Sequence, residues 1–209
     1  MRLTPPKIFI MLLSQRHLAV TAAALALAFF TASSHAERNA SLAGQNVVQP
    51  IAGGQHTKEY ARNGQLIYEV IERKTSQGTI EAIEREWTED GTPLRDQYFL
   101  GGNEIKATFW YRNGQVKETR VDQSTRDPKA LPGKYVERFS DLGRLRSSGV
   151  FQGQFRPVGL HREYDESGRL AREVEYDARG VRLATREYDA AGKVTKAERY
   201  LPDGSRRLE

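Results

Sequence analysis

The feature of the sequence that most constrains the fold is a twelve-residue repeat near its C-terminal end. The pattern Tyr-Asp-x-x-Gly begins at Tyr164, Tyr176 and Tyr188, and the related segment Tyr-Leu-Pro-Asp-Gly begins at Tyr200. Twelve residues are too few for a helix pair or a strand–helix unit, which need about 30. One strand and one tight turn fit this length, so we expect each repeat to be a strand followed by a turn.

The residues of the repeat match the chemistry of such a turn. An aspartate accepts hydrogen bonds from backbone amides within a turn, and glycine adopts a positive φ at no steric cost. We therefore assign a structural turn role to seven residues: Asp165, Asp177, Asp189, Gly168, Gly180, Gly192 and Gly204.

A looser aromatic-x-x-x-Gly frame recurs upstream, starting at Tyr60, Trp87, Tyr98, Trp110 and Phe139, with insertions expected at 69–86 and 121–138. The seven or eight residues between turns are an ordinary strand length, and short turns force neighbouring strands to be antiparallel. Good helix formers occur between the turns, but a glycine every twelve residues would interrupt every helix. The sequence predicts an all-β fold over 58–209, an antiparallel β-hairpin repeat meander forming a single-layer or weakly curled sheet.

The repeated aromatic residues allow two interpretations. Because twelve is an even number, period-two alternation predicts that the repeat tyrosines share one face, with Arg182 between Tyr176 and Tyr200. The rings either pack at the hairpin ends or form a binding surface. If they bind a partner, the candidate residues are Trp87, Trp110, Tyr164, Tyr176, Tyr188 and Tyr200.

The first 36 residues are typical of a secretory signal peptide. A basic start is followed by the apolar run 18–30 and by Ser34-His35-Ala36, and we expect cleavage after Ala36. An uncleaved membrane anchor is the alternative, although the run is shorter than a spanning helix needs. The mature protein is then expected to be periplasmic or secreted, with no stable membrane insertion. Residues 37–57 are rich in Gly, Asn and Gln without periodicity and predict a flexible leader.

Composition narrows the function further. Residues 1–36 hold three Lys or Arg and no acidic residue, so their removal lowers the formal net charge from +5 to +2. Positively and negatively charged residues are interleaved along the rest of the chain, which disfavours nucleic acid as a partner. The absence of cysteine excludes disulfides and thiol chemistry. About a third of the mature residues are apolar, too few for a thick core.

No motif for catalysis or for a cofactor stands out. Two histidines follow the signal segment, His56 and His161, and neither has a second histidine at metal-ligand spacing. Nucleophile-elbow and phosphate-loop patterns are missing from the sequence. We expect no enzyme, no metal and no cofactor; a hydrolase with a dispersed carboxylate pair remains a minority alternative.

The repeats resemble a known class. Residues 151–170 (FQGQFRPVGLHREYDESGRL), with NGQLIYEV (63–70) and NGQVKETRV (113–121), look like the bacterial variant of the MORN repeat. The C-terminal units are also similar to the YD repeats of polymorphic-toxin shells. Proteins resembling this MORN variant are commonly named as an antitoxin family, which implies a protein-binding role.

Two functions follow as expectations. The first is an exported, non-enzymatic repeat protein that presents a β-sheet surface to a protein partner, as an envelope scaffold or as an antitoxin- or immunity-like binder. The second is a module that binds cell-wall glycan, such as peptidoglycan, through exposed aromatic residues. Open sheet edges favour association, so a dimer is compatible with either function.

Overall fold

A computed structural model describes residues 36–125 and 131–208, all of which belong to one compact unit. Two short 3₁₀ helices, η1 (Ala40–Leu42) and η2 (Gln123–Thr125), accompany fourteen strands. The strands are β1 (Asn46–Ile51), β2 (Gly54–Tyr60), β3 (Leu66–Lys74), β4 (Ile80–Trp87), β5 (Pro93–Leu100), β6 (Asn103–Trp110), β7 (Val116–Asp122), β8 (Lys134–Phe139), β9 (Leu145–Gln152), β10 (Arg156–Tyr164), β11 (Leu170–Tyr176), β12 (Arg182–Tyr188), β13 (Val194–Tyr200) and β14 (Arg206–Leu208).

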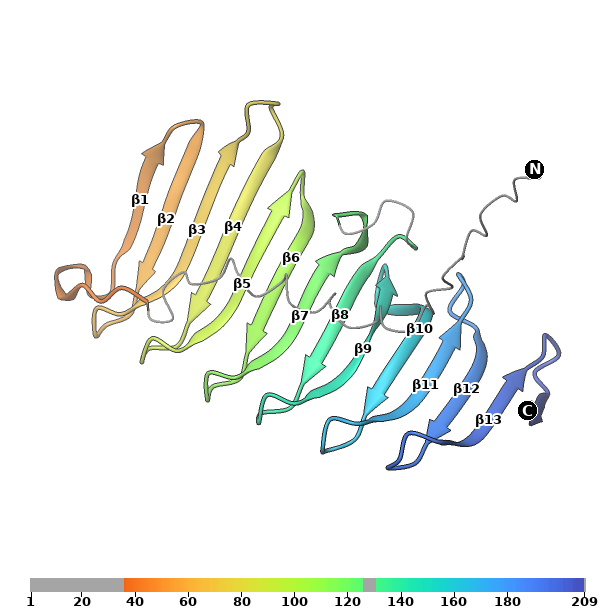
Figure 1. The fold of residues 1–209 in the computed structure, drawn as a ribbon. Coiled ribbons are helices and arrows are strands. Elements are labelled where there is room, and N and C mark those ends of the chain that lie inside the picture. Colours follow the sequence, from red (N-terminus) through yellow and green to blue (C-terminus); the bar gives the residue numbers. More distant parts are fainter. Residues whose placement is uncertain (1–35, 126–130, 209) are drawn as a thin grey trace, which may run out of the picture. The chain divides into compact units, whose positions relative to one another are not determined.

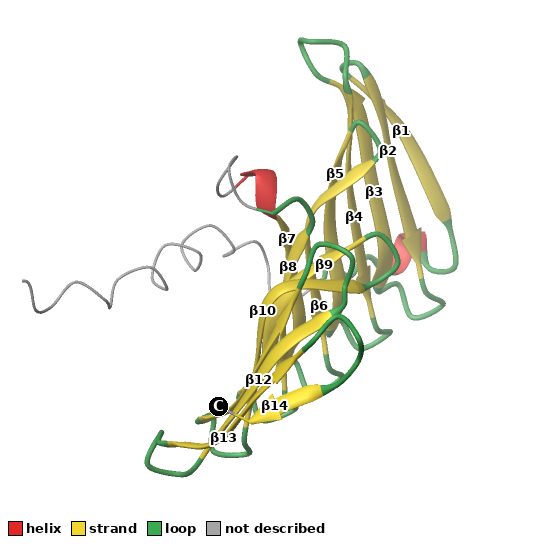
Figure 2. Ribbon diagram, turned by 90° about the vertical axis from the view of Figure 1, so that its right-hand side faces the viewer, coloured by secondary structure: helices red, strands yellow, loops and turns green. Residues whose placement is uncertain are grey.

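All fourteen strands form one open antiparallel sheet whose spatial order is the order of the sequence (Figure 1). Seen from the side, the sheet is one layer thick and its strand direction turns from β1 to β13 (Figure 2), as the right-handed twist of β-strands requires. The predicted all-β hairpin meander is confirmed. No helix in the described ranges is long and apolar enough to cross a membrane.

The two long edges of the sheet differ. On the first edge, which we call the turn edge, six five-residue turns follow the even-numbered strands β2 to β12, and all share two backbone hydrogen bonds. In the turn 165–169, for example, Asp165 N donates to Arg169 O (2.8 Å) and Gly168 N donates to Asp165 O (3.0 Å). The opposite edge has connections of unequal length, from Ala52-Gly53 to the segment after β7.

A repeat of one hairpin describes the whole chain better than a repeat of one strand. The aromatic residues that precede the six turns, from Tyr60 to Tyr188, are 23 to 29 residues apart. The expected frame at Tyr98 is wrong, because Tyr98 lies inside β5 and the turn there is Gly101-Gly102. Residues 69–86 are not an insertion either: they extend β3 and β4.

The N-terminal boundary of the sheet also needs correction. The prediction of a flexible, unstructured leader over 37–57 is wrong, because β1 and the start of β2 lie within it and pair residue by residue, from Asn46 opposite Glu59 to Ile51 opposite Gly54. The composition misleads here because β1 is held by backbone pairing with β2 across the short Ala52-Gly53 turn, which polar side chains also permit. The predicted signal segment lies outside the described residues, except for Ala36.

Burial is confined to narrow rows, as expected for a single layer. The largest fully buried side chains among the described residues are only those of Val136 and Val158. Ala107, Val136 and Val174, together with Gln97 and Glu198, are buried along the middle of one face. Ala107 and Val136 are both paired with Arg120, and Val174 is paired with His161, so cross-strand pairs replace a deep core.

Candidate functional site

One unbroken row of cross-strand partners defines a face of the sheet that we call face A. Directly paired residues of antiparallel strands point to the same face. Twelve residues are paired in succession from β2 to β13, and we call them the polar row: Lys58, Glu69, Arg85, Asp96, Thr108, Thr119, Glu137, Ser148, Arg162, Glu173, Arg186 and Ala197.

Two positions after each polar-row residue on an even-numbered strand lies an aromatic residue, which therefore points to face A as well. Tyr188, for example, follows Arg186, and its hydroxyl donates to Glu173 of the polar row (2.7 Å). The six residues lie next to the turn edge, one on every second strand, at intervals of about 10 Å. We call them the aromatic row: Tyr60, Trp87, Trp110, Phe139, Tyr164 and Tyr188.

Each aromatic residue of this row faces an apolar partner across its turn. A β-bulge precedes the pair in all six hairpins, and the partners are Leu66, Pro93, Val116, Leu145, Leu170 and Val194. Aromatic–aliphatic pairs of this kind contribute roughly 0.2–1 kcal/mol each. The result is an apolar ribbon along the turn edge of face A.

The structure brings together four of the six predicted aromatic candidates and separates two. Trp87, Trp110, Tyr164 and Tyr188 belong to the aromatic row. Tyr176 and Tyr200 lie on the opposite face, face B, so the prediction of one shared tyrosine face is wrong. The bulge beside each turn adds one residue and reverses the alternation that an even repeat would otherwise keep.

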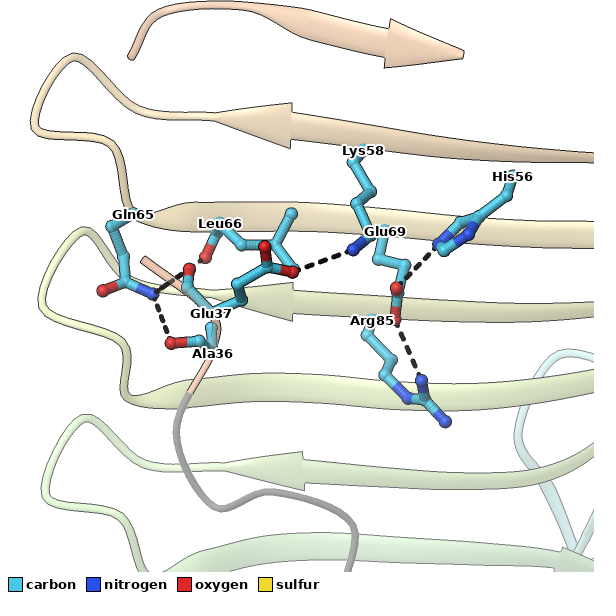
Figure 3. A network of polar contacts seen from close by, with 8 residues as sticks. All are labelled: Ala36, Glu37, His56, Lys58, Gln65, Leu66, Glu69 and Arg85. Atoms are coloured by element: carbon cyan, nitrogen blue, oxygen red, sulfur yellow. Dashed lines mark hydrogen bonds and ion pairs between the residues drawn. The ribbon is translucent and has the colours of Figure 1, made fainter. Parts of the chain in front are cut away.

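The first aromatic residue of the row is covered by the chain itself. Residues 36–45 run beside the first turn: Tyr60 N donates to Gln45 O (3.0 Å) and Leu66 N donates to Glu37 O (2.9 Å). The Gln65 amide donates to Ala36 O (2.9 Å) and Glu37 O (3.1 Å), as Figure 3 shows. Tyr60 is only 3% exposed, whereas the other five aromatic residues remain half-buried.

The polar row beside this cover carries alternating charges. Glu69, almost buried, accepts a hydrogen bond from Arg85 Nη1 (2.9 Å), and its other oxygen lies 2.7 Å from His56 Nε2 (Figure 3). Arg85 also lies 3.5 Å from Asp96, where burial raises the carboxyl pKa and the Arg85 charge opposes that rise. Lys58 donates to Glu37 (2.9 Å), and that hydrogen bond raises the pKa of Lys58. These contacts tie β2 to β5 and to the N-terminal segment.

The turn residues assigned from the sequence lie at the ends of the strands. Gly168, Gly180, Gly192 and Gly204 have φ between 77° and 84°. Asp165 Oδ1 accepts from the backbone N of Ser167 (2.8 Å) and Arg169 (3.0 Å), and Asp177 and Asp189 bind the equivalent amides of their own turns. The Ser167 hydroxyl and these amides hold the pKa of Asp165 far below its usual range.

Neighbouring turns of this edge are bonded to one another. Asn63 Nδ2 donates to Glu89 O (2.8 Å), Asn113 Nδ2 to Asp141 O (2.7 Å) and Arg144 Nη1 to Glu166 O (2.6 Å). Turn-to-turn bonds fix the spacing of the strand ends, and with it the spacing of the aromatic row.

The histidines that the sequence singles out lie in contacts with neighbouring strands. In the described ranges, no group of three His, Cys, Asp or Glu residues is placed to hold a metal ion. His161 lies between the rings of Phe151 and Tyr176 (centroids 4.8 Å and 5.1 Å away) on face B, where burial lowers its pKa. Both histidines therefore have structural partners.

Sequence reasoning missed a second feature of face B, beside the turn between β9 and β10. The rings of Phe151 and Phe155 meet edge to face at 6.1 Å, and Arg120 lies over Phe155 at 5.2 Å. The twelve-residue repeat directs attention elsewhere, and although Phe155 begins an aromatic-x-x-x-Gly segment (155–159), residues 156–159 lie in β10 and not in a turn. The signal that could have found them is the compact segment FQGQF itself (151–155).

Comparisons with solved structures give only distant similarity. A crystal structure of TarM aligns with a TM-score of 0.21 and 10% identity, and a mutant of Staphylococcus aureus TarM in complex with fondaparinux, α-GlcNAc-glycerol and UDP aligns with a TM-score of 0.20 and 10% identity. In both cases the alignment covers 78% of this chain and 21% of the other, so the chain spans about a fifth of their length. No curated protein matches the sequence.

One family model matches part of the chain. Residues 157–178 match the MORN repeat variant, a range that contains most of β10, the turn 165–169 and all of β11. The match therefore spans one hairpin of the turn edge, including Tyr164 of the aromatic row. The chain carries a MORN-variant repeat at this hairpin, and its other five turn-edge hairpins share the same turn and bulge geometry.

Proposed function

We propose that this chain is an exported, non-enzymatic repeat protein that binds a protein partner through the apolar ribbon of face A. The observation that carries the proposal is the contrast within the aromatic row. Tyr60, beneath the chain's own residues 36–45, is 3% exposed, while Trp87 to Tyr188 are half-buried. A polypeptide segment is thus the kind of cover that this ribbon already accepts at its first aromatic residue.

The composition of the ribbon suits a protein interface. Aromatic side chains are enriched where proteins bind, because they bury a large area at a small cost in conformational entropy. The polar row runs beside the ribbon with charges of both signs, which supplies register and specificity for a bound segment. An envelope scaffold and an antitoxin- or immunity-like binder would both use such a surface.

Export rests on the predicted signal segment. Cleavage after Ala36 would leave Glu37 as the first residue, and Glu37 O would still accept from Leu66 N. The first aromatic residue would therefore keep its cover in the mature protein. Mass spectrometry of the protein recovered from the cell envelope tests this directly: a mature N-terminus at Glu37 is expected, and an intact N-terminus would refute cleavage.

Photo-crosslinking from the ribbon tests the binding function. Trp110 is replaced by a photoreactive phenylalanine derivative, and Tyr200 on face B is replaced in the matched control. We expect one dominant protein adduct from position 110 and none from position 200. Equal adducts from both positions, or none from either, would refute an interface on face A.

A further inference from the structure

We propose that a small hollow on face B, beside the turn between β9 and β10, binds one neutral saccharide ring. The site is separate from the ribbon of face A and does not depend on the protein-binding function proposed above. The hollow has a volume of about 260 Å³. Its lining combines two phenylalanines, two cations and two carboxylates over a floor of small residues: Phe151, Phe155, Arg120, Lys134, Glu104, Asp122, Gly133, Val136 and Gly153.

The first sign of a site is the backbone of Phe155. Its φ of 60° is the only positive value among the described residues other than glycine. A left-handed conformation is a strained outlier for a bulky residue, and such strain clusters at binding sites. The strained turn nevertheless leaves an apolar ring 52% exposed. Arg120 lies over this ring at 5.2 Å, and the remainder of the ring stays exposed at the mouth of the hollow.

Strand register builds the wall beneath this ring. Asp122, Lys134 and Phe151 are direct cross-strand partners on β7, β8 and β9. Gly133 keeps space beside them, because a Cβ there would lie 2.5 Å from Phe151 O and its φ is 137°. Val136, 2% exposed, lies at the floor. The hollow is therefore formed by rigid strands as well as by the turn.

The size of the hollow limits the ligand. Sites for drug-sized ligands and cofactors occupy about 300–1,000 Å³. A volume of about 260 Å³ lies below that range and suits a single ring. Nucleotides and larger cofactors are too big to be enclosed.

The charges of the lining select a polar ligand without net charge. Glu104 accepts from Lys134 (2.7 Å) and Gln97 (2.9 Å), and its Oε2 lies 3.8 Å from Arg120 Nη1. Asp122 is the second carboxylate of the lining. Two cations thus face two carboxylates around the hollow, and neither an anion nor an ammonium group gains a net opposite charge. The lining holds both donors (Arg120 and Lys134) and acceptors (Glu104 and Asp122), which suits several hydroxyl groups better than the apolar side chain of a partner protein.

The aromatic walls complete the chemistry of a sugar site. A saccharide ring has an apolar C–H face and a hydroxyl-bearing edge. Phe155 and Phe151 offer surfaces for the C–H face, while Lys134 and Asp122 lie within the same lining for the hydroxyls. Lys134 has three ammonium donors and uses one for Glu104. The space beside Gly133, the paired charges of the lining and the exposed ring of Phe155 together favour a neutral sugar unit.

Titration of the full-length chain with simple sugars tests the proposal. Amide NMR spectra are recorded with neutral methyl glycosides of glucose, galactose and N-acetylglucosamine, and with glucuronate and glucosamine as charged counterparts. We expect a Kd on the order of 1 mM for at least one neutral glycoside, as a ligand of this size allows. Shifts should centre on residues 133–136 and 151–156. No saturable shift for any neutral glycoside, or tighter binding of a charged sugar, would overturn the proposal.

The variant Phe155→Gly separates binding from folding. Glycine adopts the φ of 60° without strain, so this variant is expected to fold at least as well as the wild type. Loss of the ring should weaken neutral glycoside binding by roughly tenfold. Tyr200→Ser removes another face-B ring outside the hollow and should leave the affinity unchanged. Retained affinity in Phe155→Gly, or binding of an apolar peptide side chain instead of a sugar, would contradict the site. Crosslinking from position 110 should persist in Phe155→Gly, which keeps the two proposals distinguishable.

Discussion

The variant Gly149→Ala is a severe local test of the packing on face B. A Cβ at this position would lie 2.3 Å from Nδ1 of His161 and 2.5 Å from two of its ring carbons. Ordinary contacts begin near about 3.5 Å, so the imidazole must move by about 1 Å. That ring is held edge to face by Phe151 and Tyr176, and its Nε2 lies 2.9 Å from Val150 O.

The expected cost follows from these contacts. Overpacking costs about 1–3 kcal/mol, and each disturbed aromatic contact costs about 0.5–1.5 kcal/mol. We therefore predict that Gly149→Ala lowers the free energy of unfolding by about 2–3 kcal/mol. Urea denaturation followed by circular dichroism measures this difference.

The same substitution in a second variant, His161→Ala, shows whether the imidazole ring causes the loss of unfolding free energy. In His161→Ala the imidazole is absent, and the alanine at 149 should then change the free energy of unfolding by less than about 1 kcal/mol, since a strand accepts alanine better than glycine. An equal loss in both backgrounds would refute the steric argument. It would place the cost of Gly149→Ala in the backbone instead.

Three further predictions follow from single residues. Pro50 lies on the outermost strand β1, opposite Gln55 and next to the tight Ala52-Gly53 turn, at a position whose backbone N points to the open side of the strand, where proline offers no donor. Pro50→Thr should therefore increase self-association in light scattering. An unchanged mass at high concentration would contradict this. Gly180 and Gly192 both have positive φ, but only at Gly180 would a Cβ meet a side chain, 2.7 Å from Arg156 Cγ. Both alanine variants should lose about 1–2 kcal/mol of unfolding free energy, with the larger loss at Gly180. Equal losses would show that the contact with Arg156 is irrelevant. Burial lowers the pKa of His161, so its contribution to stability is full above about pH 6.5, the pKa in the unfolded chain, and is lost as the pH falls through the lower pKa of the folded state. His161→Gln should remove that part of the pH dependence of the unfolding free energy. An unchanged dependence on pH would refute this.

Local turn chemistry made much of the fold predictable from the sequence. The aromatic-x-x-x-Gly frame marks turns whose geometry depends on residues within five positions, so strand ends near Tyr164, Tyr176 and Tyr188 could be inferred. The prediction that Arg182 lies between Tyr176 and Tyr200 is confirmed: Arg182 is paired with Tyr176 and lies over the Tyr200 ring at 5.4 Å.

The features that could not be predicted from the sequence depend on bulges and on pairing between strands, not on the residues of a single turn. A bulge adds one residue without a residue type that marks it, so the faces of Tyr176 and Tyr200 could not be inferred from an even repeat. Strand β1 carries no aromatic frame and depends on pairing with β2. The hollow near Phe155 forms from residues of four strands, β6 to β9, and a strained turn, and no spacing in the chain reveals it.

An open sheet presents the aromatic row along its turn edge, and pulsed electron resonance distances measure whether the sheet is open. The chain has no cysteine, so spin labels can be attached to Glu89→Cys, Asp141→Cys and Ala190→Cys, which lie in three turns of the turn edge. Four strand spacings separate neighbouring members of this set, and eight separate the outer two. At about 4.8 Å for each strand, we expect about 19 Å for Glu89 to Asp141 and about 38 Å for Glu89 to Ala190. An outer distance no longer than the inner one would mean that the sheet closes on itself, and would contradict the account.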